Sequence, residues 1–456
     1  MSTGLMFRRA LCSTLRSQRI RSASCHSNYA TSESPSRSTL QILPIKHGIY
    51  SFIKVHHYST QNGRHWKTID KASPSSNTSF TLMSYNILAQ HHVDSQPSLY
   101  HDHNPDSLRW THRFDALKQE ITDISPDILC LQEVQQNHLK EIAIHFDHLG
   151  YDTSLFKKRT GLQVDGCAIF FRRDLFDLIE FHFVDYFQPN IKILNRCNVA
   201  IIAKFALKSH PDTQFVVSTT HLLFNPKRHD IRLAQIQVLL AELDRVARDE
   251  INQHQTVPII LTGDFNIQQS SEVFRLIIGE HIVPGNLFAK MNFQFGKISQ
   301  NLLPRELGIS DNCQHLDVVI NSNRYQTALN AGVQHANCSR TVEKRIITSD
   351  DIEQSKLPFN TGVIKHHLNL VPTICPTKPF EMDTMHASTC HHNKWIMVDY
   401  IFFSESSKSM ASSSKLRLLE NYQLPTTIEC LSRNGPIPNE TLGSDHYSIA
   451  ARFSIE

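Results

Sequence analysis

Apolar residues recur along this chain from Phe80 onward with two different periods, which mark strands and helices in turn. The stretch Phe80–Asn86 alternates apolar and polar positions as a strand does, whereas Leu117, Ile121 and Ile124 keep helical spacing before Pro126. Strands are predicted over 80–86, 127–133, 166–172, 198–205, 215–221, 257–263, 395–403 and 445–453, and helices over 108–124, 137–148, 228–248 and 271–279. Strands that alternate with helices early and predominate late favour an α/β fold with sheets packed face to face and helices outside.

Two regions depart from this pattern. Residues 1–76 are basic and rich in Ser and Arg, and no Asp or Glu occurs between Met1 and Ser32. That composition is typical of a mitochondrial transit peptide, and a disordered basic tail of a cytosolic or nuclear protein is the alternative. From about 280 to 394 polar residues, histidines and dispersed cysteines follow no sustained period, so we expect a loop-rich insertion within one domain spanning 77–456.

Composition narrows the class of protein. The net charge of the 456 residues is only +3, so a polyanion would have to bind in a local cleft rather than on a generally basic surface. Ten cysteines show no paired spacing and several lie in apolar runs, which indicates reduced thiols in an intracellular protein. No apolar run approaches the ~20 residues that span a membrane, so no membrane partner is expected. A mitochondrial or cytoplasmic location is therefore predicted, with the nucleus as the remaining option.

Polar side chains stand at or beside the ends of the predicted strands. In Leu-Thr-Gly-Asp264-Phe-Asn266 a buried strand stops at a glycine and then presents a carboxylate and an amide. The same placement occurs at Asn86, Glu133, His221, Asp264 with Asn266, Asp399, and Asp445 with His446. Each has an ordinary alternative as a strand cap, a surface ion pair or a satisfied core histidine. Asp399, in mid-strand between apolar neighbours, requires a partner, and His446 is a suitable one.

Convergence of these strand ends would place four carboxylates, two imidazoles and two amides in one site. Such a cluster repels itself unless a divalent cation offsets its charge. Oxygen ligands of this kind suit Mg²⁺ or Mn²⁺ rather than zinc.

The order of these motifs resembles the endonuclease/exonuclease/phosphatase superfamily. The motifs are Ser-Tyr-Asn86, Leu-Gln-Glu133, Thr-His221, Gly-Asp264-Phe-Asn266, Asp399-Tyr-Ile-Phe and Ser-Asp445-His446. The segment Asp165-Gly-Cys-Ala-Ile-Phe-Phe is similar to the carbon-catabolite-repressor deadenylase branch, and Thr220-His-Leu-Leu-Phe-Asn-Pro is closest to its Angel proteins. The resemblance covers roughly 80–456 and implies a four-layer α/β sandwich, in which two facing mixed sheets are flanked by helices. The domain over 77–456 is then a catalytic domain.

The resemblance also implies roles for the site residues. Glu133, assisted by Asn86, would bind a catalytic Mg²⁺, with Mn²⁺ as an alternative ion. Asp445 would complete this site or a second metal position.

The remaining residues would carry out the catalytic steps. Asp264 would orient or deprotonate the attacking water, with Asn266 beside it. His446, held by Asp399, and His221 would contact the phosphate and stabilise the charge that develops.

The implied substrate is the 3′ end of single-stranded RNA, with removal of a 2′,3′-cyclic phosphate as the leading activity. A deadenylase-like 3′-to-5′ exonuclease is the runner-up, and a catalytically idle RNA- or partner-binding scaffold is a separate alternative. Candidate substrate contacts are Lys157, Lys158, Arg159, Asn198, Lys227 and Arg228, which an ordinary solvated surface would also explain. A base-stacking aromatic is expected for single-stranded RNA, but the sequence does not identify it.

Overall fold

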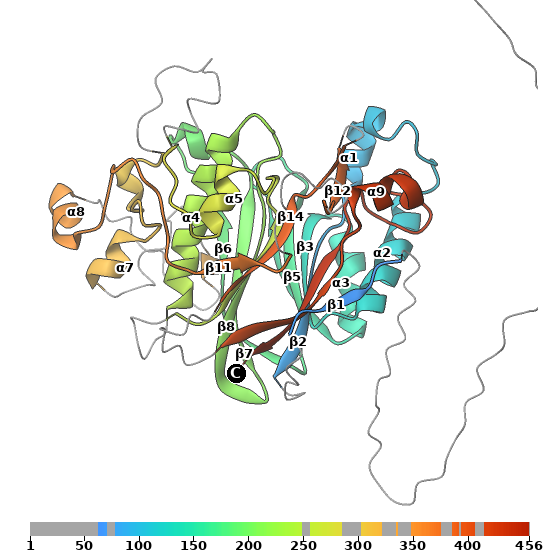
Figure 1. Ribbon diagram of the computed structural model, residues 1–456, viewed down its shortest axis with the longest axis horizontal. Helices are drawn as coiled ribbons and strands as arrows, with labels where there is room; N and C mark the ends of the chain where they lie inside the picture. Colours follow the sequence, from blue (N-terminus) through green and yellow to red (C-terminus); the bar gives the residue numbers. More distant parts are fainter. Residues whose placement is uncertain are drawn as a thin grey trace, which may run out of the picture. The chain divides into compact units, whose positions relative to one another are not determined.

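A computed structural model describes residues 63–70, 78–248, 256–284, 302–321, 334–335, 348–374, 385–391, 394–405 and 415–455. Two seven-stranded sheets face each other, and helices cover the outer side of each (Figure 1). Strand β2 pairs with β3 and β8 with β9 in parallel, while the other neighbouring strands of both sheets are antiparallel. The predicted four-layer α/β sandwich of two mixed sheets is therefore confirmed.

The first sheet packs helices against its outer face. Its strand order is β1 (Trp66–Thr68), β15 (Leu416–Tyr422), β16 (Ile449–Ile455), β2 (Ser79–Asn86), β3 (Ile128–Gln135), β5 (Asp165–Arg172) and β4 (Tyr151–Lys158). Successive side chains of a strand point to opposite faces. Met83 and Tyr85 of β2 therefore pack with α2 (Trp110–Ile124) and α3 (Leu139–His148), whereas Leu82 joins the core between the sheets.

The second sheet supplies the other half of that core. Its order is β10 (Gln334–His335), β6 (Phe176–Asp185), β7 (Val199–Leu207), β8 (His210–His221), β9 (Ile259–Asp264), β14 (Asp399–Ser404) and β11 (Leu370–Pro372). Aromatic rings join the two sheets, with centroids 5.0 Å apart for Phe80 and Phe215 and 5.5 Å apart for Phe403 and Phe453. Helices α4 (His229–Ala247) and α5 (Glu272–Ile277) cover the far face (Figure 1).

Shorter elements connect these layers. They are α1 (Gln90–Ser95), η1 (Pro97–Leu99), η2 (Lys192–Leu194), η3 (Arg305–Leu307), α7 (Leu316–Asn321), α8 (Ser349–Ser355), β12 (Thr389–His391), β13 (Lys394–Ile396), α9 (Thr427–Glu429) and η5 (Cys430–Asn434). In the described part of the chain, no helix is both long enough and apolar enough to cross a membrane. Of the segment 1–76, residues 1–62 and 71–76 lie outside the described residues, so the transit peptide stays a prediction.

Two predicted strands differ from the observed ones. The single strand expected over 395–403 is interrupted at Met397 and Val398, so that β13 pairs with β12 and β14 joins the second sheet. The strand expected from 445 begins instead at Ile449, because the residues before it form a loop of the site described below. The other predicted strands and helices are confirmed, with small shifts at their ends.

Helix α4 is buried on all sides, and charged residues lie inside the structure around it. The carboxylate of Glu242 is 3.0 Å from His315 Nε2 and accepts a 2.7 Å hydrogen bond from Arg245 Nε. Glu242 is fully buried, and although burial alone would raise its pKa, Arg245 and His315 hold the pKa below its usual range. The segment around His315, within the stretch predicted as an insertion, is thus held to α4 by the contact between His315 and Glu242.

Replacing Glu242 with alanine should lower the free energy of unfolding by about 3–5 kcal/mol, because Arg245 is left buried without this carboxylate. Urea denaturation measures the change. Lys208→Ala, which removes the exposed ion pair with Asp177, is the control and should have little effect. Equal effects of the two substitutions would contradict a structural role for the Glu242 contacts.

Candidate active site

Three site residues form one row across the second sheet. His221 lies opposite Asp264 in the parallel pair β8–β9, and Asp399 lies opposite Asp264 in the antiparallel pair β9–β14. Two residues before His221, Thr219 Oγ1 accepts a 2.8 Å hydrogen bond from Gln132 of the first sheet. Because strand side chains repeat every second residue, His221 also faces the first sheet.

The glycine before Asp264 permits this close pairing. Gly263 has φ +141°, and a Cβ built on it would lie 2.0 Å from the carbonyl oxygen of Thr220. A side chain at this position would therefore push β9 away from β8. Gly263 is therefore required by the pairing of β9 with β8, and not only by a turn.

Asn86 connects the two sheets at the site. Its Nδ2 donates to Glu133 Oε1 at 3.0 Å and to Asp264 Oδ2 at 3.1 Å. Its Oδ1 accepts from the Leu88 backbone at 3.0 Å, while Glu133 Oε2 accepts from Ala89 N at 2.9 Å. The loop that follows β2 thus orients carboxylates from both sheets.

Glu133 reaches this position through a β-bulge. The pairing of β3 with β5 shifts register between Leu131 and Val134, and Glu133 has φ +57°. Strict alternation would direct Glu133 away from the face that carries Gln132, but the bulge turns its side chain toward Asn86. Left-handed backbone at a non-glycine residue is strained and is often found at functional sites.

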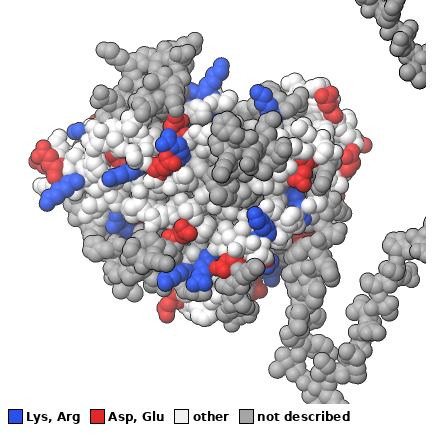
Figure 2. All heavy atoms as spheres, in the orientation of Figure 1, with Lys and Arg blue, Asp and Glu red and all other residues white. Residues whose placement is uncertain are grey.

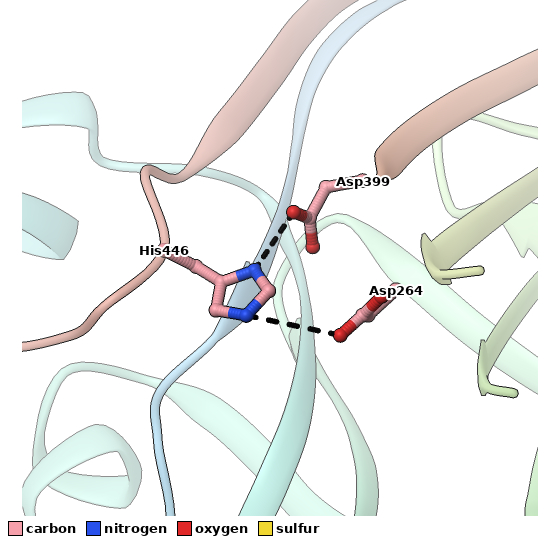
Figure 3. Close-up of side chains that lie close together, drawn as sticks. All are labelled: Asp264, Asp399 and His446. Atoms are coloured by element: carbon pink, nitrogen blue, oxygen red, sulfur yellow. Dashed lines mark hydrogen bonds and ion pairs between the residues drawn. The ribbon is translucent and has the colours of Figure 1, made fainter. Parts of the chain in front are cut away.

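His446 lies between the two aspartates (Figure 3). Its Nδ1 is 2.8 Å from Asp399 Oδ2, and its Nε2 is 3.8 Å from Asp264 Oδ2. Burial opposes the imidazolium, but Asp399 and then Asp264 raise the pKa of His446 well above its usual value. Burial and the nearby Asp399 raise the pKa of Asp264 to about 7. The expected pairing of His446 with Asp399 is confirmed, and it favours a protonated imidazole.

The loop that carries His446 is fixed by its neighbours. Ser444 Oγ donates to the Asn86 carbonyl at 2.6 Å and accepts from His446 N at 3.1 Å. Thr389, on β12, donates to the Asp445 carbonyl at 2.7 Å. These hydroxyl groups explain why 445–448 form a loop rather than the predicted start of a strand.

A buried arginine holds the same loop to the one after β2. Arg113 of α2 is fully buried and donates to the carbonyl groups of Ile87, Leu88 and Gly443 at 3.1, 2.8 and 2.9 Å. Burial lowers its pKa to about 10. Sequence reasoning missed this residue, because an arginine in an amphipathic helix resembles any solvated side chain.

His221 and Glu133 have opposite electrostatic environments. Burial lowers the pKa of His221 to about 3, so its imidazole is neutral at pH 7, and Nε2 is 3.5 Å from Asp264 Oδ2. Burial alone would raise the pKa of Glu133, but the nearby His92 and hydrogen bonds from Ala89 and Asn86 lower it to about 2. Glu133 is therefore ionised, as a metal ligand must be.

Asp445 presents a carboxylate oxygen toward the site. Tyr100 donates to its Oδ2 at 3.0 Å, while its buried Oδ1 accepts no hydrogen bond from the described residues and lies 4.0 Å from His446 Nε2. Burial raises the pKa of Asp445. An oxygen of this kind is available to a cation.

Two groups of residues could hold a metal ion. Ligand atoms of Asp264, Asp399 and His446 lie within 4.8 Å of one another, and in this group His446 Nδ1 and Asp399 Oδ2 already contact each other at 2.8 Å. Glu133 and Asp445 instead offer carboxylate oxygens, including the free Oδ1 of Asp445, while Asn86 turns Nδ2 toward Glu133 and assists it as the resemblance implied. Oxygen donors suit Mg²⁺ or Mn²⁺, so the predicted ligand set fits such an ion.

Next to Glu133 lie two further polar residues, His92 and Asp165, that sequence reasoning did not assign to the site. His92 Nε2 is 3.7 Å from Glu133 Oε2 and 3.8 Å from Asp165 Oδ1. Asp165 is 1% exposed and pairs with Arg159 at 3.1 Å. Its place in the motif Asp165-Gly-Cys-Ala is the signal that could have identified it.

Arg159 is the predicted substrate contact that lies nearest to the carboxylates, through Asp165. Asn198 is buried and donates to the His221 carbonyl at 3.0 Å, while its Oδ1 accepts from Gln235. Asn198 therefore supports the strand end of His221. Its direct contact with substrate stays a prediction.

The other predicted contacts lie on loops and strand edges. Lys157 Nζ is 2.8 Å from Asp185, and Lys158 Nζ donates to the Gln163 carbonyl at 2.7 Å. Arg228 pairs with Asp230 at 2.7 Å, and Lys227 is exposed. Binding of RNA by these four residues also stays a prediction.

Asn266 contacts Asp264 through its backbone N–H and not through its side chain. Its backbone N donates to Asp264 Oδ1 at 2.9 Å, and its side-chain Nδ2 donates to the Leu222 carbonyl at 3.1 Å. Asn266 therefore orients Asp264 and fixes the start of the loop after β8.

On the face shown in Figure 2, described basic and acidic residues are interspersed, which agrees with recognition in a local site.

Fold and site together define the class of protein. Two facing mixed sheets carry, at one end, carboxylates, histidines and an asparagine that converge from six strand ends and loops. The chain belongs to the Endonuclease/Exonuclease/phosphatase family, whose sequence model matches residues 83–446. The resemblance expected from the motifs is confirmed.

Within this family the chain is similar to the Angel proteins. It is 33% identical to "Protein angel homolog 2" of Danio rerio over 421 residues, which cover 86% of this chain and 69% of the relative. It is 32% identical to "Protein angel homolog 2" of Homo sapiens, over 83% of this chain and 69% of the relative. A crystal structure of ANGEL2, described as a 2′,3′-cyclic phosphatase in complex with adenosine-2′,3′-vanadate, matches with a TM-score of 0.66 and 31% identity, covering 86% of this chain and 98% of that one.

Replacing Gly263 with alanine should lower the free energy of unfolding by about 3 kcal/mol or more, from overpacking against Thr220 and from backbone strain. Urea denaturation measures this change. Gly279→Ala is the matched control, since Gly279 has φ +88° but open space around a Cβ, and only the backbone strain of about 1–2 kcal/mol is expected. A smaller loss at Gly263 than at Gly279 would contradict the close approach of β8 and β9.

Proposed function

We propose that this chain is a Mg²⁺-dependent phosphoester hydrolase that removes 2′,3′-cyclic phosphates from the 3′ ends of single-stranded RNA. The observation that carries the proposal is the buried Asp264, which lies between Asn86, His221 and His446. A carboxylate beside an imidazolium supplies both a proton acceptor and a proton donor. The likeness to the solved 2′,3′-cyclic phosphatase supports the choice of substrate.

The ion would be held by the carboxylates of Glu133 and Asp445, with Asn86 orienting Glu133, and Mn²⁺ would fit the same oxygen donors. When bound, such an ion neutralises charge on the phosphoryl oxygens. The other proposed steps use side chains of this chain.

Asp264 is the proposed proton acceptor. Its pKa, raised to about 7 by burial and by Asp399, is suited to taking a proton from water near neutral pH. The hydrogen bond from Asn266 N fixes Oδ1, and the bond from Asn86 fixes Oδ2. The carboxylate is thus oriented before the water arrives.

His446 is the proposed proton donor. Its Nδ1 is engaged by Asp399, so Nε2 is left to face the phosphoryl group. As the water oxygen bonds to phosphorus and transfers a proton to Asp264, the phosphorus–O2′ bond breaks and O2′ takes the proton from His446. The neutral His221 contacts a phosphoryl oxygen. Once the proton on Asp264 has returned to His446 through solvent, a second water repeats the step at the remaining ester bond and releases phosphate.

Replacing Asp264 with alanine should lower the rate of phosphate release from cyclic-phosphate-ended RNA by at least about 10²-fold, because the proton acceptor is lost. Steady-state phosphate release measures the rate. Asp177→Ala removes a half-exposed carboxylate on β6 and should leave the rate unchanged. Unchanged turnover in the Asp264 variant would rule out this mechanism.

Three RNA substrates test which ester is hydrolysed. The first ends in a 2′,3′-cyclic phosphate, the second ends in a 3′-phosphate, and the third is poly(A) with a 3′ hydroxyl. Phosphate release without shortening of the cyclic-ended RNA supports the phosphatase. A ladder of shortened poly(A) would instead support the 3′-to-5′ exonuclease. No turnover of any RNA, with intact fold, would support a binding scaffold.

Mg²⁺ should raise the melting temperature of the protein, because an ion that binds the folded state alone stabilises it. Asp445→Asn should raise the Mg²⁺ concentration for the half-maximal shift by about tenfold or more. Asp399→Asn is the control, since Asp399 contacts His446 and the Mg²⁺-dependent shift should persist. Loss of the shift in Asp399→Asn alone would place the ion between Asp264, Asp399 and His446.

A further inference from the structure

Tyr100 contacts the side chain of Asp445 from outside the proposed metal site. Its hydroxyl donates a 3.0 Å hydrogen bond to Asp445 Oδ2, and the tyrosine is only 8% exposed. Within the described residues, no other group donates a hydrogen bond to this carboxylate. The orientation of the Asp445 side chain therefore depends on this hydroxyl.

The hydrogen bond decides which oxygen of Asp445 is left for a cation. The torsion about the Cβ–Cγ bond of an aspartate is broad, so an unrestrained carboxylate exchanges its two oxygens easily. Tyr100 fixes Oδ2, and Oδ1 is left 4.0 Å from His446 Nε2. Thr389 fixes the backbone separately, through its 2.7 Å bond to the Asp445 carbonyl. A hydrogen bond to the outer oxygen of a carboxylate is a common way to orient a metal ligand.

Packing holds the ring of Tyr100 in place. The residue follows the short helix η1, where its backbone N–H donates to the Pro97 carbonyl at 3.1 Å. The ring packs with Leu88 and Val93 in a small apolar cluster, and the ring of His103 meets it edge-on at a centroid distance of 5.3 Å. A side chain fixed by packing presents its hydroxyl without a further loss of freedom.

The segment after Tyr100 is fastened to the chain just before Asp445. His103 Nε2 is 3.0 Å from the carbonyl oxygen of Ile437, and Asn104 Nδ2 donates to Glu440 at 3.1 Å. These contacts hold the two segments together without involving the Asp445 carboxylate.

The segment before Tyr100 orients the other proposed ligand carboxylate. Leu88 belongs to the apolar cluster beneath the tyrosine, and the next residue, Ala89, donates its N–H to Glu133 Oε2 at 2.9 Å. One stretch of chain, from 88 to 100, thus supplies a hydrogen bond to each of two carboxylates that are far apart in the sequence.

We propose that Tyr100 is a positioning residue of the metal site, whose hydroxyl fixes Asp445 Oδ2 and so leaves Oδ1 available to the cation. This inference rests on the proposed function, in which Asp445 is a ligand. Tyr100 acts through Asp445, since its hydroxyl contacts that carboxylate and neither the proposed proton acceptor nor the proposed proton donor.

Replacing Tyr100 with phenylalanine should raise the Kd for Mg²⁺ by about tenfold, because Asp445 is no longer held in one orientation. Isothermal titration calorimetry measures this Kd in the absence of RNA. Phenylalanine keeps the ring packing against Leu88 and Val93, so the fold should be retained. Excess Mg²⁺ should restore kcat for phosphate release, because the hydroxyl takes no part in the proton transfers.

Tyr151→Phe is the matched control. It also removes a buried tyrosine hydroxyl, which donates to the Pro126 carbonyl. Tyr151 pairs with Arg172, at the end of β5 opposite to Asp165. This substitution should lower the melting temperature and leave the Kd for Mg²⁺ unchanged.

The outcomes separate this inference from the proposed function. A wild-type protein that binds no Mg²⁺ overturns the proposed metal site, and the inference with it. Wild-type binding with an equal Kd in Tyr100→Phe overturns the inference alone. An equal rise in Kd for Tyr151→Phe would also overturn it, because the effect would then follow from the loss of any buried hydroxyl.

Discussion

The structure of the site depends on one buried carboxylate. Asp264 is 2% exposed between two sheets, and a charge removed from water at this depth must be offset by neighbouring groups. Asn86 from the first sheet, His221 from the adjacent strand and His446 from a distant loop surround its Oδ2. The strand ends cannot separate without leaving that charge uncompensated. The same contacts that stabilise the folded chain therefore arrange the proposed catalytic groups.

The loops of the site are held by arginines of the outer helices. Arg113 of α2 and Arg232 of α4 each donate to three backbone carbonyl groups, and both are fully buried. A planar guanidinium with several donors can satisfy carbonyl groups from separate turns of a loop. The outer layers thus order irregular segments that have little regular structure of their own. Substrate-facing loops can differ while the sheet ends keep their arrangement.

The sequence pattern identified the strongly apolar elements but not the weaker ones. Strands such as β3, β7 and β9 are buried along almost their whole length, so their continuous apolar runs predicted them correctly. Strands β4, β6 and β15 were not predicted, because much of their length is only partly buried and their residues are mixed. These strands form through pairing with more regular neighbours. Propensity is a weak guide wherever tertiary contacts supply most of the stabilisation.

The sequence by itself determined that Asn86, His221 and Asp264 stand at strand ends, because a period of two and a glycine or polar stop are local features. It also indicated that Asp399 needs a partner such as His446. Only the tertiary structure decided that a bulge turns Glu133 toward Asn86 and that the Lys157 ammonium pairs with Asp185. Bulges, register and the partners of long side chains depend on segments far apart in the chain. Local sequence patterns carry no information about which distant segments of the chain come into contact.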